Sequence, residues 1–158
     1  MNIYEFAENP NTSPEILDGL AKHKNWCVRY CVAVNPSTLP ETLNILSRDE
    51  DSEVIHGVAQ NPNTPQELLI KLSTDYSYNV REYVAENPNT PSEILDTLSY
   101  DEDADVRSSV AWNCSTSPET LERLSNDKSW YIYYYVARNN NTPSYIKRYI
   151  GYNEYLEN

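Results

Sequence analysis

The stretch AENPNTPSEILDTL, residues 85–98, recurs with small changes along most of the 158-residue chain. Other copies contain VAVNPSTLPETLNIL, VAQNPNTPQELLIKL and VAWNCSTSPETLERL. The copies are spaced by 26 residues, and no insertion shifts their register. Self-similarity at a fixed period is typical of a solenoid, in which each unit packs against its neighbours. Two columns keep the period throughout, at Asn9, Asn35, Asn61, Asn87, Asn113 and Asn139, and at Thr12, Thr38, Thr64, Thr90, Thr116 and Thr142.

Each unit is predicted to contain two short helices, because its apolar residues recur three and four positions apart. The first helix is expected to begin at Thr90, which forms a Thr-x-x-Glu pattern with Glu93. This pattern is typical of a capping box, in which the hydroxyl accepts from an early backbone N–H. Leu95 and Leu98 lie on one face of that helix. Neither helix is long enough to be stable alone, so stacking has to bury the Leu and Val columns in one continuous core.

The second helix follows a corner rich in Asp and Ser, and Asp103 is its expected N-cap. The helix is expected to end at Asn-Pro, because the residue before proline avoids the α region. Arg29, Arg81 and Arg107 form a broken column on the second helices. This column could form an anion-binding ladder, but we favour pairing of each arginine with a carboxylate of the neighbouring unit.

The register predicts a single repeat domain over residues 1–158, with an N-terminal half-repeat at 2–8, five full repeats at about 9–138 and a C-terminal cap at 139–158. Residues 84–107 carry almost in full the pattern V-A-x-N-P-x-T-P-x-E-L-L-x-x-L-x-x-D-x-x-x-x-V-R, which resembles the leucine-rich repeat variant family. The resemblance implies an all-α, right-handed α-solenoid of short helix pairs, alternating between α and 3₁₀ geometry, without a β-sheet. The founding member has a cysteine-rich cluster-binding segment ahead of its repeats. This chain lacks such a segment, so that cofactor is not expected.

The composition limits the classes of partner. Lys and Arg total 12 against 24 Asp and Glu, which gives a formal net charge of −12. This balance argues against direct binding of nucleic acid or of an anionic membrane surface, and it permits a basic protein partner. The sequence contains no apolar run of about 20 residues and no visible signal peptide. A cytoplasmic location is therefore expected, and three irregularly spaced cysteines agree with it.

The sequence contains few residues suited to metal binding or catalysis. His23, Cys27 and Cys31 are spaced four residues apart, as metal ligands on one helix face would be. However, His23 lies in the corner before the helix and no fourth ligand is evident, so we expect no metal. The chain has two histidines, His23 and His56, and neither lies in a context that points to a nucleophile. We therefore predict no catalytic residue, no cofactor and no enzymatic activity.

The partner-binding surface is expected where the units differ, because the inner columns of a solenoid repeat while its outer surface varies. The outer stripe of the second helix is predicted at positions 27, 30, 31 and 34 and their equivalents. Its most aromatic row lies in SWYIYYYVARNNN, residues 129–141. Exposed Tyr and Trp suit a protein-binding surface. The candidate partner-binding residues are Tyr30, Tyr83, Trp112, Tyr131, Tyr134, Tyr135 and Arg138.

Two other interpretations of the aromatic residues stay open. The C-terminal tyrosines would cover the open end of the stack, or the aromatic residues would bury a homodimer contact, although a monomer is favoured. The first alternative places Tyr145, Tyr149, Tyr152 and Tyr155 over the end, with Tyr131 and Tyr133 packed beneath.

The leading hypothesis is a non-catalytic repeat scaffold that mediates protein–protein interaction through the variable face of its second helices and its aromatic C-terminal region. The alternative is an acidic decoy that inhibits a nucleic-acid-binding protein by presenting spaced carboxylates. The two differ in salt dependence: decoy binding would weaken steeply with added salt, whereas binding anchored by aromatic residues would not.

Overall fold

The computed structural model describes residues 2–156, with side chains as far as residue 150, as helices joined by short turns. Twelve helices and no strand occur within these residues, so the predicted all-α fold is confirmed. All twelve are α-helices, and the 3₁₀ alternation that the resemblance implies is not seen in this part of the chain. None of the described helices combines the length and apolar character of a membrane span. The helices are α1 (Ile3–Glu8), α2 (Pro14–Leu20), α3 (Trp26–Val34), α4 (Pro40–Leu46), α5 (Ser52–Gln60), α6 (Gln66–Leu72), α7 (Tyr78–Glu86), α8 (Ser92–Leu98), α9 (Ala104–Trp112), α10 (Pro118–Leu124), α11 (Trp130–Arg138) and α12 (Ser144–Leu156).

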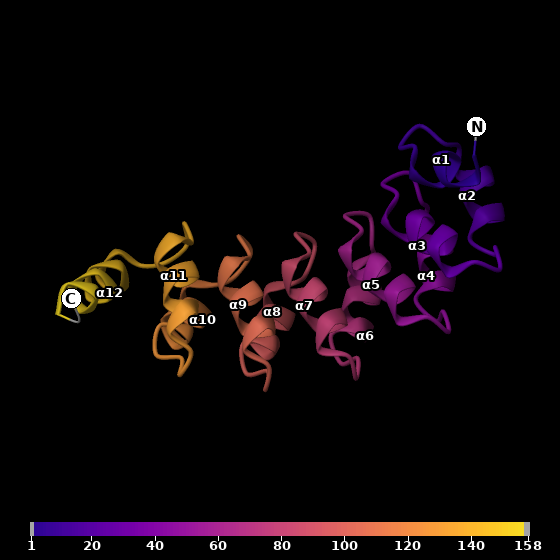
Figure 1. The fold of residues 1–158 in the computed structure, drawn as a ribbon. Helices are drawn as coiled ribbons and strands as arrows, with labels where there is room; N and C mark the ends of the chain where they lie inside the picture. Colours follow the sequence, from indigo (N-terminus) through magenta and orange to yellow (C-terminus); the bar gives the residue numbers. More distant parts are fainter. Residues whose placement is uncertain (1, 157–158) are drawn as a thin grey trace.

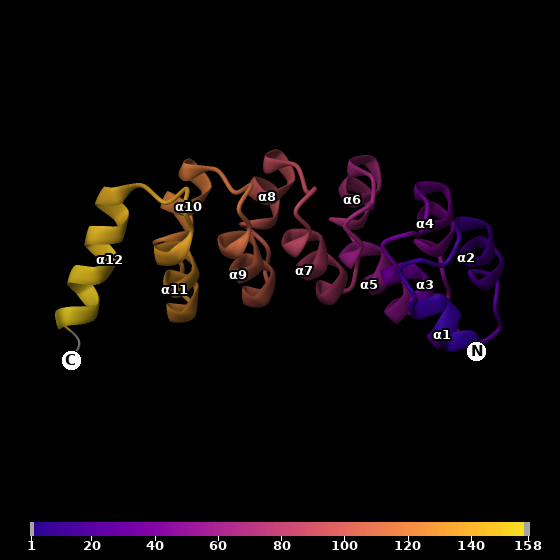
Figure 2. The same ribbon diagram turned by 90° about the horizontal axis from the view of Figure 1, so that it is seen from above.

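The helices form two rows, which Figure 2 shows side by side. The even-numbered helices are the first helices of the units, and the odd-numbered helices are the second helices. Successive second helices pack directly on one another along the stack. The stack bends at its N-terminal end, and the second helices lie on the inner side of that bend (Figure 1). The predicted solenoid is therefore confirmed, and the second-helix row forms its inner surface.

The core consists of columns of equivalent side chains. The leucine of the first helix, the valine pair of the second helix and the alanine after it are fully buried in nearly every unit. Burying a Leu or Val side chain contributes roughly 1.5–3 kcal/mol, so these columns dominate the stability of the stack. The leucine column is Leu17, Leu43, Leu69, Leu95 and Leu121, and the alanine column is Ala7, Ala33, Ala59, Ala85 and Ala111.

The predicted Thr-x-x-Glu capping box is wrong. The N-cap of α8 is Pro91, and the preceding Thr90 is buried with its hydroxyl turned inward. Thr90 Oγ1 donates to the carbonyl oxygen of Val84 at 2.5 Å, and equivalent bonds recur at the other column threonines. The last carbonyls of a helix have no partner within the helix. The threonine hydroxyl therefore satisfies the C-terminal end of a second helix instead of the start of a first helix.

The asparagine column forms a hydrogen-bonded series that links the units, here called the asparagine ladder. Asn87 Nδ2 donates to Ala59 O at 2.7 Å and to Asn61 O at 2.9 Å, in the preceding unit. Its Oδ1 accepts from the backbone N–H of Asn89 at 2.9 Å, which fixes the turn that follows α7. The same pair of donations to the preceding unit recurs at Asn35, Asn61, Asn113 and Asn139.

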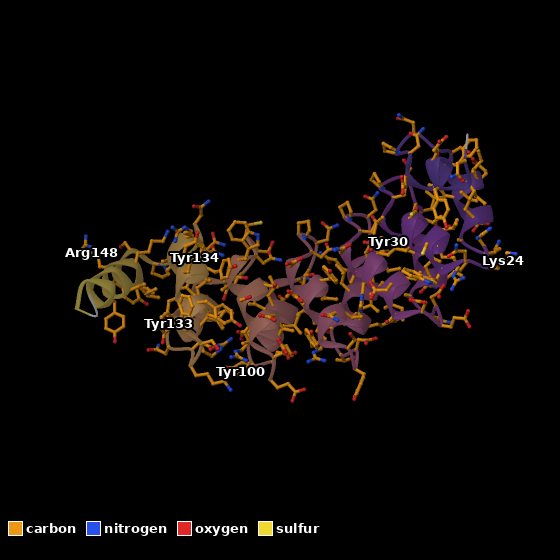
Figure 3. All side chains as sticks on the ribbon, viewed as in Figure 1. Lys24, Tyr30, Tyr100, Tyr133, Tyr134 and Arg148 are labelled. Atoms are coloured by element: carbon orange, nitrogen blue, oxygen red, sulfur yellow. The ribbon has the colours of Figure 1, made fainter. Side chains whose placement is uncertain are left out.

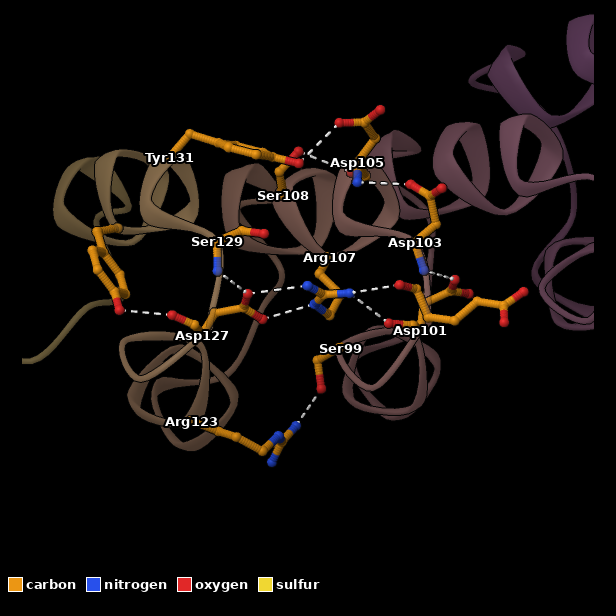
Figure 4. Close-up of polar contacts among 12 residues, drawn as sticks. Ser99, Asp101, Asp103, Asp105, Arg107, Ser108, Arg123, Asp127, Ser129 and Tyr131 are labelled. Carbon is orange, nitrogen blue, oxygen red and sulfur yellow. Dashed lines mark hydrogen bonds and ion pairs between the residues drawn. The ribbon is translucent and has the colours of Figure 1, made fainter.

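The predicted pairing of the arginine column is confirmed. Arg81 Nε and Nη2 contact the two carboxylate oxygens of Asp101 at 2.6 and 2.9 Å, across a separation of 20 residues. Arg29 pairs in the same way with Asp49, and Arg107 with Asp127. Figure 4 shows Arg107 between Asp127 and the backbone of Asp101. Two-point contact of this kind fixes the orientation of both groups, so each pair holds two units in register.

We expect Asn87→Ala to lower the free energy of unfolding by about 3 kcal/mol, because it leaves buried carbonyl and N–H groups without partners. Urea unfolding monitored by circular dichroism measures this loss. Asn44→Ala, at an exposed position within α4, is the matched control and is not expected to lower stability, because alanine is the better helix former. Equal effects of the two substitutions would contradict the structural role of the ladder.

The Arg81–Asp101 pair is expected to make stability depend on pH. Burial alone would raise the pKa of Asp101, but hydrogen bonds from Arg81 and from the N–H of Asp103 outweigh it, so the pKa lies below its ordinary value of 3.8. The stabilisation is thus fully present above pH 3.8 and is lost as the pH falls through the lowered pKa. Asp101→Asn should cost about 3 kcal/mol at pH 7, because it leaves a mostly buried guanidinium without its counter-ion.

The control for this substitution is Asp75→Asn. Asp75 occupies the equivalent corner and accepts from Ser77 N, but Ile55 stands where the arginine would be. The amide keeps that acceptor, so a change of about 0.5 kcal/mol or less is expected. Unfolding curves at pH 7 and at pH 3 test both variants, and a loss at Asp101 that is independent of pH would count against the pairing.

Candidate functional site

A groove with a volume of about 690 Å³ crosses the second-helix row over α7, α9 and α11. We call it the acidic–aromatic groove, because three carboxylates and four aromatic side chains lie among its nine lining residues. It is lined by Glu82 and Glu86 from α7, by Asp105, Ser108, Ser109 and Trp112 from α9, and by Trp130, Tyr131 and Tyr135 from α11.

The groove lies on the predicted outer stripe of the second helices. Val106 and Val110 face the core, so the residues one position before each valine and two positions after it face the other way. All four stripe positions of α9 therefore line the groove: Asp105, Ser108, Ser109 and Trp112. Trp130 lies one position ahead of the stripe, at the first residue of α11, and was not among the predicted residues.

The aromatic side chains of the groove contact one another edge to face. The rings of Trp112 and Tyr135 have centroids 6.0 Å apart at an interplanar angle of 79°, and those of Trp130 and Tyr131 are 6.1 Å apart at 87°. This is the arrangement that aromatic pairs prefer. The Trp112 and Trp130 side chains nevertheless remain 60% and 79% exposed, so large apolar surfaces face solvent here.

Tyr131 bridges two units at the edge of the groove, and Figure 4 shows its hydroxyl reaching Asp105. Tyr131 Oη donates to Asp105 Oδ1 at 3.1 Å. Burial raises the pKa of Tyr131, and the hydrogen bond to Asp105 raises it further. The hydroxyl therefore keeps its proton at neutral pH and holds α11 against α9.

The two glutamates of the groove are in an environment that disfavours their charge. Burial raises the pKa of Glu82, and the charges of Glu86, Asp105 and Asp103 raise it further. Burial also raises the pKa of Glu86. A hydrogen bond from the Ser109 hydroxyl, 3.5 Å away, lowers this pKa but offsets the effect of burial only in part. The Glu86 side chain is exposed as a whole, so it is the surroundings of its carboxylate, rather than enclosure of the residue, that cause this shift. A positive charge placed between these carboxylates would favour the charged form of both.

Tyr134 and Arg138 lie beside the groove without lining it. The guanidinium carbon of Arg138 is 3.6 Å from the centre of the Tyr134 ring, a cation–π contact. The Tyr134 ring also packs edge to face on Tyr135, with centroids 5.4 Å apart. Five of the seven predicted candidates, Trp112, Tyr131, Tyr134, Tyr135 and Arg138, are thus together at the C-terminal part of the row.

Tyr30 and Tyr83 lie in a separate cluster toward the N-terminus, and Figure 3 shows Tyr30 far from Tyr134 along the row. Gly57 allows α3 and α5 to approach closely, since a Cβ there would lie 3.0 Å from Ala33 Cβ and 3.1 Å from the Tyr30 ring. Tyr83 packs against His56, with ring centroids 5.8 Å apart. Both tyrosines are half-buried, which gives them a packing role between units.

The C-terminal tyrosines do not cover the end of the stack in the way the end-cap interpretation expects. Tyr145 and Tyr149 are 57% and 59% exposed, and among residues 144–150 the buried side chains are those of Ile146 and Ile150. Tyr133 Oη donates to Asp127 O at 2.6 Å, which ties it to its own corner. Tyr152 and Tyr155, which the same interpretation names, lie outside the described side chains.

Two other clusters contain side chains of the kinds that ligate metals or carry out catalysis. His23 Nδ1 accepts from Asn25 N at 3.1 Å, which orients the ring toward its own corner, and the side chains of residues 2–150 include no group of three His, Cys, Asp or Glu placed to hold a metal ion. Ser77, His56 and Glu53 form a serine–histidine–carboxylate series, with separations of 3.5 and 3.4 Å. These distances exceed the 2.6–3.2 Å typical of a nucleophile and its base, and His56 is buried, so packing explains the series better than nucleophilic catalysis.

Comparison with known proteins supports the family resemblance. The family model described as leucine rich repeat variant matches residues 78–103. The match covers one repeat of the chain. The resemblance drawn from the sequence is therefore confirmed, and the matched repeat contains α7 and α8, including Glu82 and Glu86 of the groove.

A solved structure is also similar to this chain. It is described as a leucine-rich repeat variant with a novel repetitive protein structural motif. The sequences are 24% identical, and the match covers 90% of this chain and 72% of the other, with a TM-score of 0.42. No curated protein matches the chain.

We expect the double substitution Glu82→Gln and Glu86→Gln to leave the free energy of unfolding at pH 7 unchanged or higher. Both pKa values are raised, so the folded state disfavours the charged forms, and a neutral amide removes that cost. Wild-type stability should accordingly improve as the pH falls through the raised values. The gap between variant and wild type should close in acid, where both glutamates are protonated.

The measurement is urea unfolding of the wild type and the double variant between pH 7 and pH 4. Asp101→Asn, an acid-to-amide change at an arginine-paired carboxylate, is the contrasting control and is expected to destabilise. A loss of more than about 1 kcal/mol in the glutamine double variant would show that these carboxylates support the fold.

Proposed function

We propose that this chain is a non-catalytic repeat scaffold that binds another protein across its second-helix row, with the acidic–aromatic groove as the main contact. The observation that carries the proposal is the exposure of Trp112 and Trp130 over one continuous groove. Exposed Trp and Tyr are the residues that most often dominate binding energy at protein interfaces, because they bury much area at a small entropic cost.

The architecture supports this assignment. The buried columns are nearly identical between units, whereas the residues that face the groove differ between α7, α9 and α11. A solenoid of this kind presents an extended surface whose chemistry varies along its length, which suits recognition of a partner that lies across several units.

Within the described part of the chain, the serine hydroxyls of the groove make no hydrogen bond to a base at the roughly 2.6–3.2 Å typical of nucleophilic catalysis, since the Ser109 hydroxyl is 3.5 Å from the Glu86 carboxylate. Ser108 Oγ donates to Asp105 O at 2.9 Å, and the Ser109 hydroxyl faces Glu86. The two histidines of the chain are in α5 and in the corner before α3, away from the groove lining. The acidic and aromatic side chains therefore favour binding over acid–base chemistry.

Affinity purification from the native cell, read by mass spectrometry, tests the proposal when wild type is compared with Trp112→Ala. We expect wild type to retain a protein that Trp112→Ala loses by about tenfold or more, as is usual for truncation of a central aromatic anchor. Tyr76→Ala is the matched control, since Tyr76 is a fully exposed aromatic outside the groove, and it should retain the same protein.

Salt separates the scaffold from the alternative decoy. Retention of the partner in 0.5 M NaCl agrees with an aromatic anchor, whereas its release along with nucleic-acid-binding proteins would favour the decoy. If Trp112→Ala and Tyr76→Ala retain the same proteins in the same amounts, the groove is not the binding surface and the proposal is wrong.

A further inference from the structure

The length of the acidic–aromatic groove determines what kind of ligand can fill it. It crosses three stacked helices, and stacked helices are spaced by about 10 Å, so its length is roughly 20 Å. An extended peptide rises about 3.3 Å per residue, so a segment of about six residues spans this distance. The volume of about 690 Å³ agrees with a short peptide segment.

The charge of the groove determines the chemistry of that ligand. Glu82, Glu86 and Asp105 line it, and no Lys or Arg does. Among the side chains of residues 2–150, the three carboxylates make no salt bridge, and their hydrogen-bonding side-chain neighbours are the hydroxyls of Ser109 and Tyr131. By contrast, Asp49, Asp101 and Asp127 each have an arginine. The groove is thus a place where carboxylates are close together and lack a cation.

The aromatic walls favour a planar cation. Trp112 and Trp130 keep most of their side-chain surface exposed next to these carboxylates. A guanidinium can stack on an indole face while its N–H groups reach a carboxylate, whereas an ammonium is a compact, strongly hydrated charge. The chain itself contains such contacts: Arg138 lies 3.6 Å from the Tyr134 ring centre, and Arg123 lies 4.1 Å from that of Tyr100 while it pairs with Asp96.

We infer that the acidic–aromatic groove binds an extended, arginine-containing segment of a partner protein, with a guanidinium against Trp112 or Trp130 and in contact with the groove carboxylates. This inference rests on the proposed function and names the chemistry of the partner. Arginine is preferred over lysine because the site offers both a flat aromatic surface and carboxylate pairs, which a guanidinium engages at once.

The chain provides its own reporter for a test. It has three tryptophans: Trp112 and Trp130 line the groove, and Trp26 lies at the start of α3, far along the row. The indole N–H signals in a ¹⁵N spectrum can be assigned with Trp112→Phe and Trp130→Phe. The probe is the peptide acetyl-Gly-Ser-Gly-Arg-Gly-Arg-Gly-Ser-amide, with matched peptides that carry lysine or citrulline in place of both arginines.

We expect the arginine peptide to shift the Trp112 or Trp130 signal saturably, with a dissociation constant on the order of 0.1–1 mM for so short a probe. Trp26 should not move. The citrulline peptide, which has the shape of arginine without its charge, should not bind, and the lysine peptide should bind at least about threefold more weakly. Absence of a saturable shift, an equal shift of Trp26, or equal binding of the citrulline or lysine peptide would overturn the inference.

Two double variants with the same net charge sharpen the test. Glu82→Gln with Glu86→Gln should weaken the arginine peptide about tenfold. Glu67→Gln with Glu93→Gln removes two exposed carboxylates from the first-helix row and should leave its affinity within about twofold. Equal weakening by the two pairs would assign binding to the overall negative charge. An unchanged Trp26 signal shows that each variant is folded.

Failure of this inference can be told apart from failure of the proposed function. If a cellular partner is lost with Trp112→Ala while the arginine peptide leaves Trp112 and Trp130 unmoved, the scaffold function stands and the partner is recognised by other chemistry. If neither depends on Trp112, both the function and the inference are wrong.

Discussion

The structure depends on the asparagine ladder more than on any other polar contact. A helix of nine residues, such as α5 or α7, leaves its last four carbonyls without partners inside the helix. In this chain the Thr64 hydroxyl donates to the carbonyl oxygen of Val58. Asn87 of the next unit donates to the carbonyl oxygens of Ala59 and Asn61. The end of each second helix is therefore complete only when the next unit is stacked on it. This requirement couples helix formation to stacking and makes the units cooperative, although each helix is too short to be stable alone.

Because the ladder, the leucine column and the arginine–aspartate pairs lie between or beneath the helices, they leave the outer stripe of the second helices free to vary. Replacement of Ser108 by another residue would disturb none of these contacts, whereas replacement of Asn87 would disturb three hydrogen bonds. The shape of the stack is not fully independent of the stripe, however. Gly57 occupies a stripe position and permits a close approach of α3 and α5, and Tyr30 takes the space that a larger residue would need. Stripe residues therefore divide into those that set the local spacing of helices and those that face solvent.

Periodicity was sufficient to predict the helices, their order and the buried columns, because apolar spacing within a short helix determines which face is buried. It was not sufficient for the polar contacts between units. Thr90 and Glu93 match a local capping pattern, but the Thr90 hydroxyl instead donates to the carbonyl oxygen of Val84, near the end of the preceding helix. Asn87 was visible as a column, yet an Asn before Pro also suits a simple helix stop, and its partners belong to another unit. Proline itself is not required, since Asn113, which precedes a cysteine, has the same backbone conformation as Asn87.

In the groove, stripe geometry located Trp112 and Tyr135. It missed Trp130, because a long side chain at the first position of a helix covers surface outside its own stripe.

The two kinds of carboxylate in this chain have opposite energetic consequences. Asp49, Asp101 and Asp127 have pKa values below the ordinary value, because hydrogen bonds from arginine and backbone outweigh their burial, so their charge stabilises the fold. Glu82 and Glu86 have raised pKa values, so their charge opposes it. Acidic groups that cost stability and lie beside exposed tryptophans are difficult to explain by folding alone, since a neutral side chain would serve the stack as well. Carboxylates with raised pKa values are candidates for a surface that binds a charged ligand, where an incoming cation would favour their charged forms.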